Sequence, residues 1–223
     1  MKIKRVEILA SKPSELLDFY HQKLGFSLVE GEDFAVECGD SVLAFAQGEL
    51  EGVYHFAFNI PANDMQLAVG WLKSLAIELL PFDGKEIVPF VNWKAAGIYF
   101  YDPAGNIVEL IGRERMRYVP SASFDAKSIR SISEMGLATK AFEKHIDQLQ
   151  SETGIPVFGN RSTRFCALGD DAGLFIVVNS HVKKWIPNME DAPPLPFNIS
   201  IEENRTRWEI QFQPRLLTIT PAG

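Results

Sequence analysis

The chain has 223 residues, of which 46% are hydrophobic and 11% aromatic, so it has the composition of a folded protein with room for one large or two smaller domains. Its 29 acidic and 22 basic side chains give a net charge of −7 with no cluster of Lys and Arg, which argues against nucleic acid as a partner. Because no run approaches the apolar length of a membrane helix and the first residues look like a strand rather than a leader, we expect a cytoplasmic protein with no membrane partner.

Periodicity predicts three successive segments, each with a strand, a helix and three strands. The first has a strand at 2–10, a helix ending at Gly25, and strands at 26–30, 34–38 and 41–46. The second has a strand at 53–60, a helix at 65–76, and strands at 78–80, 97–101 and 107–111. The third has a strand at 132–139, a helix at 141–153, and strands at 156–159, 163–168 and 173–179. The remainder is reduced, with strands at 197–201, 207–212 and 216–219 and no predicted helix.

Two connecting segments stand out from this pattern. Residues 81–96 form a long loop rich in aromatic side chains, which suits a lid over a cavity or a packing flap. Residues 115–127 are polar and contain proline, as expected of a linker. We therefore predict a domain at 1–114, in which two units close one curved half-barrel, and a second, degenerate domain at 128–223.

Two polar residues interrupt otherwise apolar strands. Alternation places His55 on the face opposite Phe56 and Phe58, and it places Glu109 on the same face as Ile107 and Ile111. If these faces are covered, each polar side chain needs a hydrogen-bond partner, a proton or a cation. A hydrogen-bonded core histidine and a solvated glutamate are the structural alternatives.

The strings HFAFNIP and YFYDPAGNIVEL, together with RVEILASKPSELLDFYHQKLGF at the start, resemble the vicinal oxygen chelate superfamily. This superfamily includes glyoxalase I, bleomycin-resistance proteins and extradiol dioxygenases. The resemblance covers residues 1 to about 114. It implies an α+β fold in which paired βαβββ units form curved half-barrel sheets, and a small molecule as the partner.

In the superfamily, metal ligands come from the first and last strands of each unit. His55 and Glu109 match these positions in the second unit, whereas Arg5 and Leu43 occupy them in the first, with Glu7 as a displaced ligand or an ion-pair partner of Arg5. The third unit has Glu134 and Val177 there and so lacks a ligand pair. The resemblance thus implies a divalent ion (Fe, Mn, Zn or Ni) on His55, Glu109 and Glu7, with Glu109 as the catalytic residue.

Three functions follow. The first is a metal-dependent glyoxalase-like or dioxygenase-like enzyme acting on a small molecule with vicinal oxygens. The second is a metal-free, bleomycin-resistance-like binding protein. The third is a structural homodimer with a relic site, so whether the chain is an enzyme stays open. The residues expected to line the small-molecule pocket are Arg5, Phe45, Trp93, Tyr99 and Tyr101.

Overall fold

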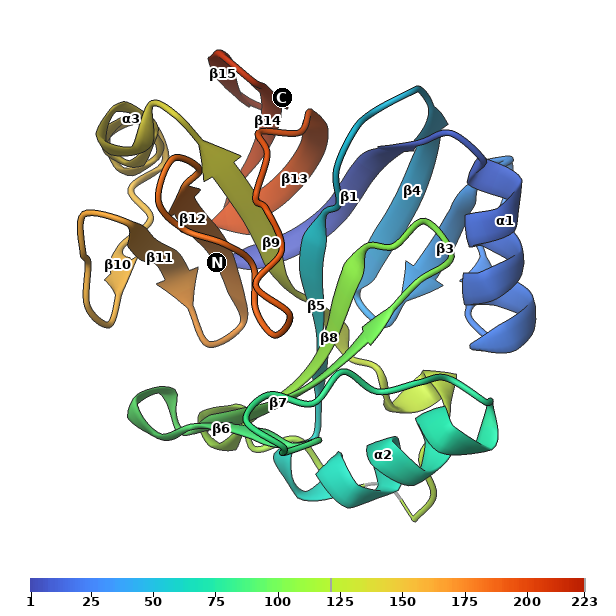
Figure 1. Cartoon of the computed structure of the whole chain (residues 1–223). Coiled ribbons are helices and arrows are strands. Elements are labelled where there is room, and N and C mark those ends of the chain that lie inside the picture. The colour runs from blue at the N-terminus through green and yellow to red at the C-terminus, as the bar shows by residue number, and fades with distance from the viewer. Residues whose placement is uncertain (121, 223) are drawn as a thin grey trace.

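The computed structural model describes residues 1–120 and 122–222, and it has two curved β-sheets with helices at the periphery (Figure 1). The strands of the first sheet are β5 (His55–Ile60), β6 (Val88–Phe90), β7 (Ala95–Tyr101), β8 (Ile107–Arg113), β9 (Ser131–Thr139), β10 (Val157–Phe158), β11 (Phe165–Asp170) and β12 (Gly173–Asn179). The strands of the second sheet are β1 (Lys2–Ala10), β2 (Ser27–Leu28), β3 (Ala35–Cys38), β4 (Ser41–Gln47), β13 (Phe197–Glu203), β14 (Thr206–Gln213) and β15 (Leu216–Pro221). The helices are α1 (Pro13–Leu17), which continues as a π-helical segment (Asp18–Lys23), α2 (Met65–Ser74) and α3 (Phe142–Thr153).

The order of strands shows which units share a sheet. The eight-stranded sheet has the order β10-β11-β12-β9-β5-β8-β7-β6, so it joins the second unit to the third. The seven-stranded sheet has the order β15-β14-β13-β1-β4-β3-β2, so it joins the first unit to the reduced C-terminal one. The prediction that the first two units close one half-barrel is therefore wrong. The domain boundaries at 114 and 128 stay a prediction, and each sheet takes strands from both sides of them.

The junction between the two units of the eight-stranded sheet is the antiparallel pair β5 and β9, in which Phe56 lies opposite Met135. A contact from the other sheet helps to place β9. The turn between β3 and β4 donates a hydrogen bond from the Asp40 amide to the Arg130 carbonyl over 2.8 Å. Gly39 in this turn has a φ of +61°, and a side chain there would overlap the Arg130 backbone. The turn therefore requires glycine for both its conformation and its close approach to the start of β9.

The long loop of the second unit differs from its prediction. The expected strand at 78–80 is reduced to one isolated bridge between Leu79 and Phe100. The Leu80 amide donates to the Tyr99 carbonyl over 2.8 Å, but the next amide that could face β7, that of Phe82, bonds to the Lys85 carbonyl instead. The edge strand β6 lies further along the chain instead, inside the loop expected to be a lid or a flap. Aromatic residues of this loop are thereby fixed to the sheet.

The largest core lies on the face of the sheets opposite His55 and is rich in aromatic rings. Tyr20 stacks on Phe45 with ring centroids 5.4 Å apart, and it also contacts Phe56 and Phe58. Helix α1 packs on β4, α2 on β7 and α3 on β12. In the part of the chain that the structure describes, no helix is long and apolar enough to cross a membrane.

Candidate metal centre and its cavity

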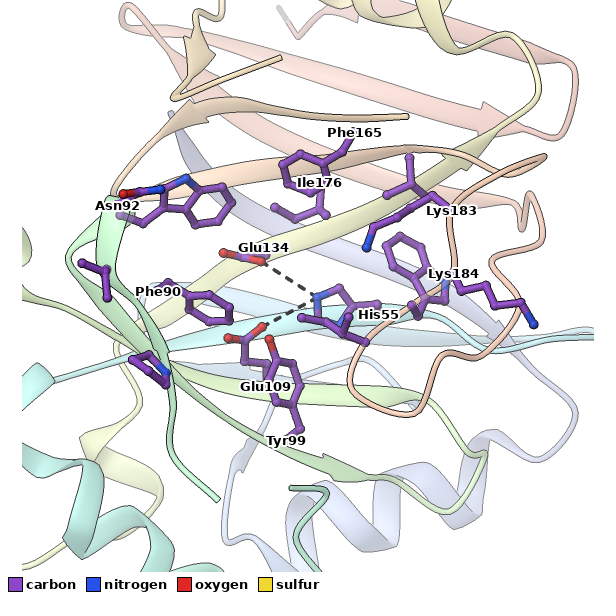
Figure 2. A pocket seen from close by; sticks show the side chains of 16 residues that line it. His55, Phe90, Asn92, Tyr99, Glu109, Glu134, Phe165, Ile176, Lys183 and Lys184 are labelled. Atoms are coloured by element: carbon purple, nitrogen blue, oxygen red, sulfur yellow. Dashed lines mark ion pairs between the residues drawn. The ribbon is translucent and has the colours of Figure 1, made fainter. Parts of the chain in front are cut away.

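Three polar side chains converge from three neighbouring strands (Figure 2). On β5, Ala57 pairs with Glu109 of β8 on one side and with Glu134 of β9 on the other. His55 precedes Ala57 by two residues on the same strand and therefore points to the same face. The methyl side chain of Ala57 is short, so it leaves the space above it to the three longer polar side chains.

The nitrogen and oxygen atoms of these residues are close together and shielded from water. His55 Nε2 lies 3.7 Å from Glu109 Oε2 and 3.9 Å from Glu134 Oε2. One donor atom from each residue lies within 4.8 Å of the other two. The exposed fractions of the residues are 5% for His55, 1% for Glu109 and 3% for Glu134.

The tautomer of His55 follows from its other nitrogen. Nδ1 lies 3.2 Å from the Ile107 carbonyl oxygen, which can only accept, so Nδ1 carries the hydrogen. Burial lowers the pKa of His55 to about 4, so the ring is neutral at pH 7. Nε2 therefore turns a lone pair, rather than a proton, toward the two carboxylates.

The carboxylates themselves are only partly neutralised. Burial and the nearby charge of Glu134 raise the pKa of Glu109 well above its usual range, whereas Arg113 and the Tyr99 hydroxyl oppose this rise. Arg113, fully buried on β8, pairs with Glu134 Oε1 and leaves Oε2 facing His55. Glu109 Oε1 is buried and accepts no hydrogen bond of normal geometry.

A divalent ion fits this arrangement. Nitrogen and oxygen ligands bind such ions at about 2.0–2.2 Å, which places the ligand atoms themselves about 3–4 Å apart. One imidazole with two carboxylates suits Fe, Mn, Zn or Ni. A cation would also satisfy the lone pairs of His55 Nε2 and Glu109 Oε2, which lie 3.7 Å apart.

The cluster lies in the wall of a cavity of about 480 Å³. Trp93 and Tyr99 line it, together with Phe90 from β6 and Phe165 from β11. The Trp185 ring also lines the cavity, and it lies beside the His55 ring with centroids 5.4 Å apart. A cavity with largely aromatic walls and a few convergent polar groups is typical of a site for a small organic molecule.

The other predicted site residues lie elsewhere. Glu7 is on β1 in the second sheet, where it accepts a hydrogen bond from Asn198 over 2.8 Å. Arg5 is also on β1 and pairs with Glu32. Phe45 belongs to the core around Tyr20. Tyr101 is on β7, but its hydroxyl is bound by Asn188 and Glu190 rather than open to the cavity.

Glu134 replaces Glu7 as the third member of the cluster. Its signal in the sequence was a carboxylate at the first-strand position of the third unit, but without a second ligand in that unit it did not suggest a site. The last-strand position of the third unit is filled by Ile176, which pairs with Gly136 and lines the cavity. Val177, predicted for that position, points into the opposite core, so the prediction was one residue out of register.

No family model and no curated protein matches the sequence. Solved structures do match the fold. A Bacillus subtilis protein described as a "putative dioxygenase" matches 99% of this chain and 84% of its own length, with 14% identity and a TM-score of 0.65. A variant of glyoxalase I from Zea mays matches 99% of this chain and 92% of its own, with 11% identity and a TM-score of 0.61. A second maize glyoxalase I variant matches 99% and 93%, with 11% identity and a TM-score of 0.60.

These comparisons establish the fold at the level of architecture. The chain has the α+β fold of paired βαβββ units with curved half-barrel sheets, as in these glyoxalase and dioxygenase structures, which confirms the predicted fold class. The match agrees with the predicted resemblance to the vicinal oxygen chelate superfamily.

Proposed function

We propose that this protein is a metal-dependent enzyme of the glyoxalase or dioxygenase type, acting on a small molecule with two adjacent oxygen atoms. The observation that carries the proposal is the convergence of His55, Glu109 and Glu134 in the wall of a cavity with aromatic walls. A divalent ion at this cluster would supply Lewis acidity to the adjacent oxygens of the substrate.

The residues of the chain have separable roles in this proposal. His55, Glu109 and Glu134 hold the ion, and Arg113 fixes Glu134 by binding its other oxygen. Glu109 is the proposed catalytic residue, because its Oε1 has no other partner of normal geometry and is free to accept a proton from the substrate. The high pKa of Tyr99, raised by burial and then by Glu109, keeps its hydroxyl protonated as a donor in the cavity.

One observation favours the metal-free binding protein as an alternative. Arg113 already neutralises Glu134, and the raised pKa of Glu109 means that a proton can neutralise the second carboxyl group. In that case the cavity would bind a small molecule without an ion. The two functions differ in whether Glu109 carries a proton or a metal.

Elemental analysis of protein purified without chelator separates the two. We expect close to one equivalent of Fe, Mn, Zn or Ni in the wild type, and its loss in His55→Ala and in Glu134→Gln. Glu7→Gln is the matched control, because it alters a glutamate of the other sheet and should leave the metal content unchanged. Absence of metal from the wild type, or full retention in His55→Ala, would support the metal-free alternative.

A further inference from the structure

A second cavity, of about 580 Å³, adjoins the first and differs from it in charge. The two share Lys183 and Lys184 in their walls, so they meet at this segment. The second cavity is also lined by Lys140 and Arg164, which brings its cations to four. For a chain with a net charge of −7, this is an unusual local concentration of positive charge.

Most of this charge is uncompensated. Among the described residues that line the second cavity, Asp191 is the one carboxylate, and it pairs with Lys184 at 2.9 Å. In residues 1–120 and 122–222, no ion pair involves Lys140, Arg164 or Lys183. The wall also holds Ser180, whose hydroxyl oxygen is buried and has no hydrogen-bond partner there. The cations, together with a hydroxyl group that has no hydrogen-bond partner, form a surface suited to an anion.

Lys183 connects this surface to the candidate metal centre. Figure 2 shows its side chain extending into the first cavity toward His55 and Glu134, whereas Lys184 extends away. Lys183 is half-buried, and its pKa is lowered by that burial and by the positive charge of Arg164. Lys183 is partly shielded and Arg164 is exposed, and a negative group between these two like charges would stabilise both.

The first cavity adds a constraint on shape. Phe90, Trp93 and Phe165 line it, and Trp185 lies beside His55, so its walls offer several flat aromatic surfaces. Flat walls favour a planar ring that stacks against them. A ring in this cavity would have the metal cluster on one side and Lys183 on another.

We propose that the substrate is a planar aromatic molecule that carries an anionic group, a carboxylate or a phosphate, bound by Lys183 and Arg164 at the junction of the two cavities. Its adjacent oxygens then reach His55, Glu109 and Glu134. This assignment rests on the proposed function, because the vicinal oxygens are part of it. The anion site itself consists of Lys183 and Arg164, and the metal cluster does not depend on these two residues.

The test compares two probes of similar size and shape, the anionic 3,4-dihydroxybenzoate and the neutral 3,4-dihydroxybenzamide. Isothermal titration at low ionic strength would measure their affinities for the wild type, Lys183→Gln and Arg164→Gln. We expect the wild type to bind the benzoate roughly tenfold more tightly than the amide, as a charge-assisted hydrogen bond predicts. Lys183→Gln and Arg164→Gln should each lose most of the preference for the benzoate and keep the affinity for the amide. Lys144→Gln, on α3 and outside both cavities, is the matched control and should keep the preference.

Equal affinities for the two probes in the wild type would overturn the proposal, as would binding of neither probe or an unchanged preference in both variants. Metal content measured in the same samples keeps the two proposals apart. A carboxylate preference in a protein that holds no metal would support the anion site and contradict the metal-dependent function. Displacement of the benzoate by inorganic phosphate would assign a phosphate group, and resistance to displacement would assign a carboxylate.

Discussion

At the scale of single residues, the metal cluster depends on a glycine, because a neighbouring side chain would occupy the space of one ligand. Gly97 on β7 lies beside Glu109, and a β-carbon at that position would overlap Glu109 Oε1 and crowd the Phe90 ring. The φ of Gly97 is not in the left-handed region, so space rather than backbone conformation accounts for the glycine. The orientation of the Glu109 carboxylate is therefore controlled by a residue that is not a ligand.

We predict that Gly97→Ala removes most of the bound metal while leaving every ligand in place, because Glu109 must turn away from the cluster. Overpacking should also cost about 1–3 kcal/mol of the free energy of unfolding. Gly70→Ala on α2 is the control, since nothing lies near its added methyl group. It should stabilise the protein by up to about 1 kcal/mol and keep the metal. Elemental analysis and urea unfolding give both quantities, and a fully metallated Gly97→Ala would contradict the proposed position of Glu109.

Two of the three cluster residues were predictable from the sequence. Alternation along their strands put His55 and Glu109 on faces where a polar group was unexpected, and both belong to the same unit. Glu134 was not predicted as a ligand, because its proximity to His55 depends on the pairing of β5 with β9. Such pairing joins units that are distant in the sequence, and strand alternation carries no information about it.

At the scale of elements, the turn between β7 and β8 holds the strand of Glu109 in place. Asp102 accepts hydrogen bonds from the amides of Ala104 and Asn106, from the Asn106 side chain, and from the Tyr20 hydroxyl over 3.1 Å. Gly105 supplies the positive φ of the turn, +80°. The sequence predicted this turn, but the bond to Tyr20, which ties the turn to the segment after α1, is a long-range contact that only the structure shows.

Asp102→Ala should lower the free energy of unfolding by about 2–4 kcal/mol, because it leaves several buried donors without an acceptor. Asp33→Ala removes a carboxylate from an exposed turn and should change the free energy by no more than about 0.5 kcal/mol. Urea unfolding of the two variants measures the difference. A loss in Asp102→Ala no larger than that in Asp33→Ala would show that the turn does not depend on this carboxylate.

At the scale of the whole molecule, the units were predictable and their partners were not. Hydrophobic periodicity identified most strands and helices of each unit, except that the strand expected at 78–80 was replaced by β6, and the resemblance added the expectation that neighbouring units pair. In the structure, the second and third units share the eight-stranded sheet, called the inner sheet here because its segments lie between the others in the sequence. The first and last parts of the chain share the seven-stranded sheet, called the outer sheet. The observed pairings, such as β5 with β9 and β1 with β13, join segments that are distant in the sequence, and the local pattern does not identify them.

A division at the predicted domain boundary tests this arrangement. The fragment 1–114 lacks β9 and β13, so it exposes one edge of β5 and one edge of β1. We expect it not to fold alone, and we expect co-expression with the fragment 115–223 to restore both the fold and the bound metal, because Glu134 comes from the second fragment. Circular dichroism would measure whether the fold is restored, and elemental analysis would measure the bound metal. A cooperative thermal transition of the fragment 1–114 by itself would show instead that it is an independent domain.

The outer sheet also sets an order of events during synthesis. β1 is joined to β13 by contacts such as that between Glu7 and Asn198, which are 191 positions apart. The ribosome makes β1 well before β13. One edge of β1 therefore stays unpaired, and accessible to other chains, until the C-terminal strands have been made. The inner sheet has all of its strands by Asn179 and can assemble earlier. The candidate metal centre can therefore be complete while the outer sheet is still being made.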